Sequence, residues 1–135
     1  MILKKIHFAI DKTPKAAVSQ KILLKKYKNY SPNQSNVIVV IGGDGFMLET
    51  LKKYRKYKKP FYGMNRGSFG FLMNKFKTKN IMKYISKARS VTISALEMTA
   101  STKDNLKKNA IAINEISLLR QSKQAASLQI LKGNK

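Results

Sequence analysis

The sequence has no cysteine, a single histidine and only six acidic residues among 135. Without cysteine the chain has no disulfide bond, thiolate nucleophile or zinc–thiolate site, a composition typical of the reducing cytoplasm. No apolar run approaches the roughly 20 residues that a membrane-spanning helix needs. The first ten residues include Lys4, Lys5 and His7, so they do not read as a secretory signal. We therefore expect a cytoplasmic protein without a membrane segment.

Basic residues are abundant, because 28 lysines and arginines give a formal net charge of +22. Such a charge predicts attraction to polyanions, including nucleic acids and membrane surfaces. Only four of these residues are arginine, at positions 55, 66, 89 and 120, and the lysines are spread over every expected surface. Nucleic-acid readers usually contact bases and phosphates through arginine. We therefore favour a general drift of surface positions toward lysine and do not expect a nucleic-acid partner.

The first ninety residues alternate between strand-like and helix-like patterns. Strands are expected over residues 4–10, 37–41 and 60–64, and helices over residues 14–27, 46–57 and 81–88. The run Val37–Ile41 is β-branched without alternation, which is typical of a strand covered by helices on both faces. This order predicts a three-layer α/β unit over residues 1–90.

The pattern changes near Val91. Strand-like segments follow over residues 91–95, 110–119 and 126–131, without a further helix pattern. The apolar face shifts by one residue at Asn114-Glu115, which predicts a bulge of the kind that often borders a site. An ordinary strand end with a surface Glu115 is the alternative. We expect residues 91–135 to begin a β-rich domain, with too few strands to close by themselves.

A glycine-rich turn, Gly42-Gly43-Asp44-Gly45, follows the central strand and precedes a helix. Glycines at the carboxyl end of a strand allow an anionic ligand to approach the backbone, and the helix start points unpaired N–H groups at the same place. A carboxylate is unusual in such a turn. A carboxylate at this position is consistent with a general base that takes a proton from an attacking hydroxyl, or with a ligand that positions a metal ion. An ordinary tight turn remains the alternative.

A second glycine-bearing loop follows the third expected strand, within the segment 63–72. It offers Asn65, Arg66 and Ser68 as polar contacts. If the strands are parallel, this loop lies beside the first turn at the carboxyl edge of the sheet, where open α/β folds bind ligands. A structural turn is the compatible alternative, and its apolar side chains are expected in the core: Phe69, Phe71 and Leu72.

Three segments in order resemble the NAD kinase family, whose phosphoryl donor is ATP or polyphosphate. They are Gly42–Gly45 after a strand, the segment 63–72, and Ala112–Ser117 with the sequence Ala-Ile-Asn-Glu-Ile-Ser. The resemblance implies a Rossmann-like amino-terminal domain over residues 1–90 and a β-rich carboxyl-terminal domain. It also implies transfer of a terminal phosphoryl group to the adenosine-ribose 2′-hydroxyl of NAD, which gives NADP.

The same resemblance implies roles for individual residues. Asp44 would accept the proton of the 2′-hydroxyl. Gly45 would lie against the dinucleotide, Asn114 and Glu115 would hold its ribose and adenine, and the second loop would shape the pocket near the phosphates. The implied nucleotide-binding residues all lie in the three motifs: Gly43, Gly45, Phe46, Asn65, Arg66, Gly67, Asn114 and Glu115.

The resemblance further implies Mg²⁺ or another divalent cation that neutralises the transferring phosphate, although no residue is assigned as a metal ligand. The family is usually a cytoplasmic homodimer or tetramer. It normally continues for well over a hundred residues, and that continuation carries a further Asp-Gly motif and a Gly-Ser-Thr-Ala-Tyr-like loop, neither of which has a counterpart here. We therefore expect an NAD kinase truncated in its carboxyl-terminal domain. The alternatives are a catalytically incomplete nucleotide-binding fragment and a lysine-rich polyanion-binding module.

Overall fold

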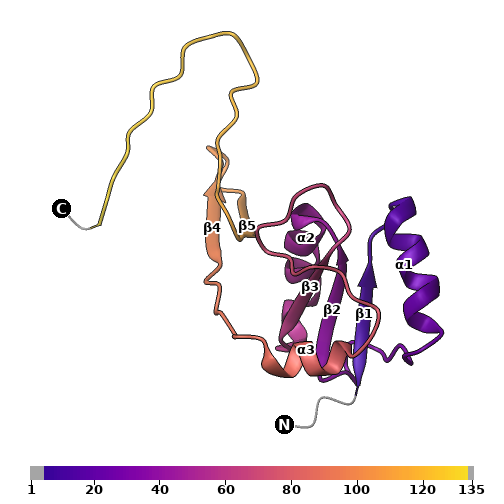
Figure 1. Ribbon diagram of the computed structural model, residues 1–135. Coiled ribbons are helices and arrows are strands. Elements are labelled where there is room, and N and C mark those ends of the chain that lie inside the picture. The colour runs from indigo at the N-terminus through magenta and orange to yellow at the C-terminus, as the bar shows by residue number, and fades with distance from the viewer. Residues whose placement is uncertain (1–4, 134–135) are drawn as a thin grey trace. The chain divides into compact units, whose positions relative to one another are not determined.

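The computed structural model describes residues 5–133 (Figure 1). The chain divides into two compact units, Met1–Ser94 and Ala95–Lys135. The first unit contains β1 (Ile6–Ile10), α1 (Pro14–Leu24), β2 (Val37–Gly42), α2 (Asp44–Tyr54), the 3₁₀ turn η1 (Arg55–Tyr57), β3 (Phe61–Asn65) and α3 (Ile81–Lys87). The second contains β4 (Leu96–Ser101) and β5 (Lys107–Ala112). Within residues 5–133, no helix combines the length and apolar character needed to cross a membrane.

The three strands of the first unit form a parallel sheet in the order β1-β2-β3. Ile10 is level with Ile41, and Gly42 is level with Asn65. All three strands therefore end at the same edge of the sheet. This register brings the two glycine-bearing loops to neighbouring positions, because one follows β2 and the other follows β3.

The central strand β2 is buried on both faces, and alternate side chains pack against different helices. Val37, Val39 and Ile41 share a core cluster with residues of α1 and α3. Ile38 and Val40 share a second cluster with α2. The sheet is thus the middle layer between helices, which confirms the predicted α/β unit. An uninterrupted β-branched run suits this strand because neither face meets water.

Loop residues hydrogen-bond to both outer strands of this sheet. At β1, the Tyr30 N–H donates to the Ile6 carbonyl at 2.9 Å. At β3, the Asn74 N–H donates to the Gly63 carbonyl at 2.9 Å, and the Asn65 N–H donates to the Asn74 carbonyl at 2.8 Å. The second glycine-bearing loop therefore returns to the strand from which it started.

The second unit is a two-stranded antiparallel ribbon in which Leu96 pairs with Ala112 and Ser101 pairs with Lys107. The strands are joined by a turn in which Asn105 adopts a left-handed backbone with φ 58°. No side chain between residues 86 and 133 is buried. An isolated two-stranded ribbon without a core is at best marginally stable in water.

Several expectations for the chain after residue 90 are wrong. The expected strands at 91–95 and 126–131 are absent, and the strand expected over 110–119 occupies Lys107–Ala112. Because β5 ends at Ala112, there is no bulge at Asn114-Glu115. Alternation of apolar and polar residues specifies strand bounds only where one face can be buried. Here the turn at Asn105 sets the pairing instead.

The large positive charge predicts that stability depends on salt. Six of the eight residues from 52 to 59 are basic, and neighbouring lysines repel one another. Raising the ionic strength from about 0.01 M to about 0.1 M shortens the Debye length from roughly 30 Å to roughly 10 Å. We expect the melting temperature to rise by about 4–8 °C, which corresponds to about 1 kcal/mol for a domain of this size. Circular dichroism measures this shift.

A Lys52→Gln/Lys56→Gln variant serves as the control for this experiment, because both side chains are exposed. It should melt higher than the parent chain at low salt and gain less from added salt. A melting temperature that stays flat or falls as NaCl is added would show that charge repulsion is not a significant term.

Candidate functional site

The first glycine-rich turn joins β2 to α2 at the carboxyl edge of the sheet. Gly43 precedes the helix with extended backbone angles of φ −102° and ψ −176°, and Asp44 is its first residue. The expected start at Phe46 is therefore two residues late. The side chain of the residue before the helix offers no cap, since it is glycine. The first turn of α2 thus faces the sheet edge without a side-chain cap, as in many anion-binding helices.

The second loop lies directly against this turn, as the parallel arrangement predicts. The Arg66 N–H donates to the Gly42 carbonyl at 2.7 Å, and Gly42 is level with Asn65. A Cβ atom placed on Gly67 would lie 3.2 Å from the Cα atom of Gly43. The two chains can approach this closely because both positions are glycine.

The Asp44 carboxylate binds the second loop. Its Oδ2 accepts a hydrogen bond from the Phe71 N–H at 2.7 Å, and its Oδ1 accepts one from the Leu72 N–H at 3.0 Å. Asp44 is half-buried. A carboxylate has about four lone-pair positions, so two hydrogen bonds leave each oxygen able to accept another. The carboxylate is therefore fixed in orientation and still open to a ligand hydroxyl.

The apolar side chains of the second loop are not in the core. Phe69 is 86% exposed and Phe71 is 97% exposed, and Leu72 is 40% exposed. The prediction that they pack inside is wrong. The backbone N–H groups of Phe71 and Leu72 turn toward Asp44, and their side chains are left in solvent. Met73 instead packs against the core cluster on the α2 side of the sheet.

The remaining residues of the first motif differ in their packing. Phe46 is half-buried and packs against the same core cluster, and its ring lies 2.8 Å from the position of a Cβ placed on Gly42. Gly45 is exposed, and nothing lies within 4 Å of its Cβ position. Gly45 therefore faces open space at the start of α2, whereas the Phe46 ring packs directly against Gly42.

Arg66 turns its side chain toward α1. Its Nε–H donates to the Ser19 Oγ at 2.5 Å, and its guanidinium carbon lies 3.8 Å from the centre of the Phe76 ring. Ser19 is fully buried and donates its own hydroxyl to the Lys15 carbonyl at 2.8 Å. Nothing in the local sequence indicates this contact, since Ser19 and Arg66 are 47 positions apart.

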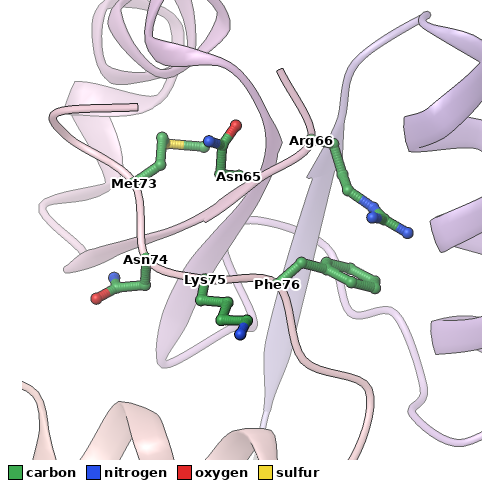
Figure 2. A pocket seen from close by; sticks show the side chains of 6 residues that line it. All are labelled: Asn65, Arg66, Met73, Asn74, Lys75 and Phe76. Atoms are coloured by element: carbon green, nitrogen blue, oxygen red, sulfur yellow. The ribbon is translucent and has the colours of Figure 1, made fainter. Parts of the chain in front are cut away.

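An open pocket of about 410 Å³ lies beside the second loop, and its lining comprises Asn65, Arg66, Met73, Asn74, Lys75 and Phe76 (Figure 2). The side chains do not converge on one point. Arg66 and Phe76 extend to one side, whereas Asn65 and Met73 lie on the other. The Asn65 Oδ1 already accepts the Gly67 N–H at 2.7 Å. Asp44 does not line this pocket, so it is separate from the carboxylate site.

A second carboxylate, Asp11, lies at the same edge of the sheet and was not singled out from the sequence. Its N–H donates to the Ile41 carbonyl at 3.0 Å, and its Cβ lies 3.1 Å from a Cβ placed on Gly42. Its Oδ1 accepts the Lys12 N–H at 2.7 Å. The available signal was its position directly after β1, because the ends of parallel strands meet at one edge.

Asn114 and Glu115 belong to the second unit. Both are exposed and follow the end of β5. The first unit alone supplies the site at Asp44, and the part of Asn114 and Glu115 in dinucleotide binding stays a prediction.

Comparison with known proteins gives the family of this site. Residues 4–91 match the family model described as the ATP-NAD kinase N-terminal domain. The chain is 44% identical over 125 residues to the NAD kinase of Brucella suis biovar 1 (strain 1330), with 93% of this chain and 49% of the relative covered. It is 46% identical over 105 residues to the NAD kinase of Rhizobium meliloti (strain 1021), with coverage of 78% and 41%.

The NAD kinase of Rickettsia bellii (strain OSU 85-389) is 37% identical over 130 residues, with 96% of this chain and 51% of the relative covered. The chain therefore spans about half the length of the curated relatives that it matches. The matched model covers the whole α/β sheet and both glycine-bearing loops. The chain belongs to the NAD kinase family.

Proposed function

We propose that the protein is an NAD kinase, which transfers a phosphoryl group from ATP or polyphosphate to the adenosine-ribose 2′-hydroxyl of NAD. The observation that carries this proposal is the Asp44 carboxylate, held by two backbone N–H groups where two glycine-bearing loops meet. The curated relatives are named NAD kinases, which supports this substrate class.

In the proposed reaction, Asp44 acts as the general base. The ribose 2′-oxygen forms a bond to the terminal phosphorus of the donor, and the bond from that phosphorus to its bridging oxygen breaks. ADP or a shortened polyphosphate leaves. The hydroxyl proton passes to a free lone pair of the Asp44 carboxylate. A positioned base contributes about 10²–10⁴-fold to the rate, and positioning and electrostatic stabilisation of the phosphoryl group supply the rest.

The presence of glycine at position 45 is an argument for a ligand at the start of α2. Its φ lies outside the left-handed region, and an added Cβ would meet nothing within 4 Å. Inside a helix, alanine is favoured over glycine by about 1 kcal/mol. Neither backbone geometry nor packing requires glycine here, so we propose that the dinucleotide lies against this position. Gly43 and Phe46 would border the same surface.

We propose that Asn65, Arg66 and Gly67 form the wall of the nucleotide pocket near the phosphates. The start of α2 and the excess of lysines both favour negative charge at this edge. Asn114 and Glu115 would bind the ribose and adenine of NAD. We further propose a cytoplasmic homodimer or homotetramer as the complete form.

A divalent cation such as Mg²⁺ fits this site only if substrate phosphates and water supply most of its ligands. Within residues 5–133, no three histidine, aspartate or glutamate side chains gather into a cluster. Mg²⁺ often binds through one or two carboxylates, with substrate phosphates and water completing its shell. Asp11 is the carboxylate at this edge that the proposed proton transfer leaves unused, so it would supply one ligand to an ion that arrives with the donor. When bound, the ion would neutralise charge on the phosphates.

A second candidate function is a nucleotide-binding fragment that needs further chain to become active. Two observations favour it. The chain spans about half the length of its relatives, and residues 86–133 bury no side chain. On this alternative, the first unit binds nucleotide, but the dinucleotide site is completed only by additional β structure.

The experiment that tests both candidates measures NADP with a coupled NADP-specific dehydrogenase. The purified 135-residue chain is compared with the same chain fused to the carboxyl-terminal half of the Brucella suis relative. NADP formed by the chain alone would support the kinase and exclude the fragment. NADP formed only by the fusion would support the fragment. If neither forms NADP from ATP or polyphosphate, the kinase proposal is wrong.

A further inference from the structure

The loop that holds Asp44 is bonded mainly near its two ends. At its start, the Arg66 N–H donates to the Gly42 carbonyl at 2.7 Å. At its end, the N–H groups of Phe71 and Leu72 donate to Asp44 at 2.7 and 3.0 Å. Phe69, between these ends, is 86% exposed and packs against no core cluster. On the other side of the donors, Met73 packs against the core and Asn74 hydrogen-bonds to β3, so that side is already fixed. The remaining freedom of the two N–H donors depends on how firmly the start of the loop is held.

The Arg66 side chain holds that start. Its Nε–H donates to Ser19 Oγ at 2.5 Å, and its guanidinium stacks on Phe76 at 3.8 Å. Both partners are themselves fixed. Ser19 is 0% exposed and bonded to the Lys15 carbonyl, and Phe76 packs against the core cluster that includes α1 and α3. We call Ser19, Arg66 and Phe76 the loop anchor.

We infer that Arg66 is a positioning residue: through the loop anchor it fixes the loop whose N–H groups orient the Asp44 carboxylate. The catalytic meaning of this inference rests on the proposed function, but the geometric claim does not. Arginine suits the role because a planar guanidinium can donate through Nε and stack on a ring at the same time. Lysine has a charge but no planar face, so it cannot make both contacts.

The test measures amide hydrogen exchange by NMR on the full chain, at Phe71 and Leu72 and at Val39 and Val40 in β2. In Arg66→Ala, we expect exchange at the two loop amides to rise by about tenfold or more, because the opening is local. Exchange at the two β2 amides should stay within about twofold of the parent chain.

Further variants separate the anchor from a general loss of charge. Ser19→Ala removes the acceptor without adding bulk and should also accelerate loop exchange. Arg66→Lys should restore only a small part of the protection. Adding Ser19→Ala to Arg66→Ala should change nothing more, since Arg66→Ala already removes the contact that Ser19 makes with the loop. Arg89→Ala, which removes an exposed arginine, is the matched control and should leave all four amides unchanged.

Two results would overturn the inference. If exchange at Phe71 and Leu72 is unchanged in Arg66→Ala while the sheet is intact, the anchor does not position the donors. If β2 amides accelerate as much as loop amides, Arg66 only stabilises the fold. In a kinase-competent fusion, positioning predicts a fall in kcat of about tenfold with the KM for the donor little changed. A raised donor KM with unchanged loop exchange would instead make Arg66 a phosphate ligand.

Discussion

Replacing Asp44 with Asn should lower kcat for NADP formation by about 10²–10⁴-fold in the kinase-competent form, because an amide cannot take the hydroxyl proton. The substitution also places an NH₂ group opposite one of the two N–H donors from Phe71 and Leu72, so one hydrogen bond is lost. Titration calorimetry should still find NAD binding within about tenfold of the parent, because a neutral hydrogen bond contributes about 1 kcal/mol. The decisive comparison is therefore between kcat for NADP formation and Kd for NAD in the same variant.

Two other aspartates serve as comparisons. Asp104→Asn lies in the exposed turn between β4 and β5 and should leave kcat unchanged. Asp11→Asn tests the other carboxylate at the sheet edge. A parent-like rate in Asp44→Asn would refute the base assignment. If the rate were lost only in Asp11→Asn, Asp44 would not be the base, and Asp11 would act either as the proton acceptor or as the ligand of the divalent ion.

The largest effect on stability is expected from Gly63→Val in β3. Valine favours strands, so local propensity alone predicts a gain. Packing predicts the opposite. A Cβ at this position would overlap the Met73 Sδ and would lie 2.6 Å from the Met47 Cε and 3.1 Å from the Leu72 carbonyl oxygen. The methionine side chains can move, but the Leu72 backbone belongs to the loop that binds Asp44.

We expect Gly63→Val to cost about 3 kcal/mol, the upper end of common overpacking penalties. That loss corresponds to a fall in melting temperature of roughly 12–24 °C for a domain of this size. Urea denaturation provides the free energy. Gly45→Ala is the matched control, because its Cβ meets nothing within 4 Å, and it should be neutral or stabilising by up to about 1 kcal/mol. Unchanged stability in Gly63→Val would mean that the Leu72 backbone and the neighbouring methionines can move to accommodate valine at little cost.

The sheet and the meeting of the two loops follow from short-range patterns. A β-branched run such as Val37–Ile41 indicates a strand covered on both faces, and parallel strands bring their following loops to one edge. The start of α2 was harder to place, because Gly-Asp-Gly also suits a turn. Aspartate is favoured in the first turn of a helix, where it complements the helix dipole, and this preference accounts for the start at Asp44.

Other features depend on contacts that no local pattern specifies. The Arg66–Ser19 bond joins residues far apart in sequence, and neither flanking segment marks it. Phe69 and Phe71 are apolar yet exposed, because the loop backbone is oriented to hydrogen-bond to Asp44. In the second unit, strand bounds were misplaced because no core exists to select one register. The spacing of apolar residues predicts strands and helices correctly where one face of the element is buried, and it fails where no face is buried.

The loop contacts at both margins of the parallel sheet also bear on self-assembly. Tyr30 occupies the free side of β1, and Asn74 occupies the free side of β3, so a foreign strand finds few vacant partners there. The ribbon of β4 and β5 pairs only with itself within residues 5–133. Fibril templating, which extends an unpaired strand edge, is therefore expected at the ribbon and not at the parallel sheet.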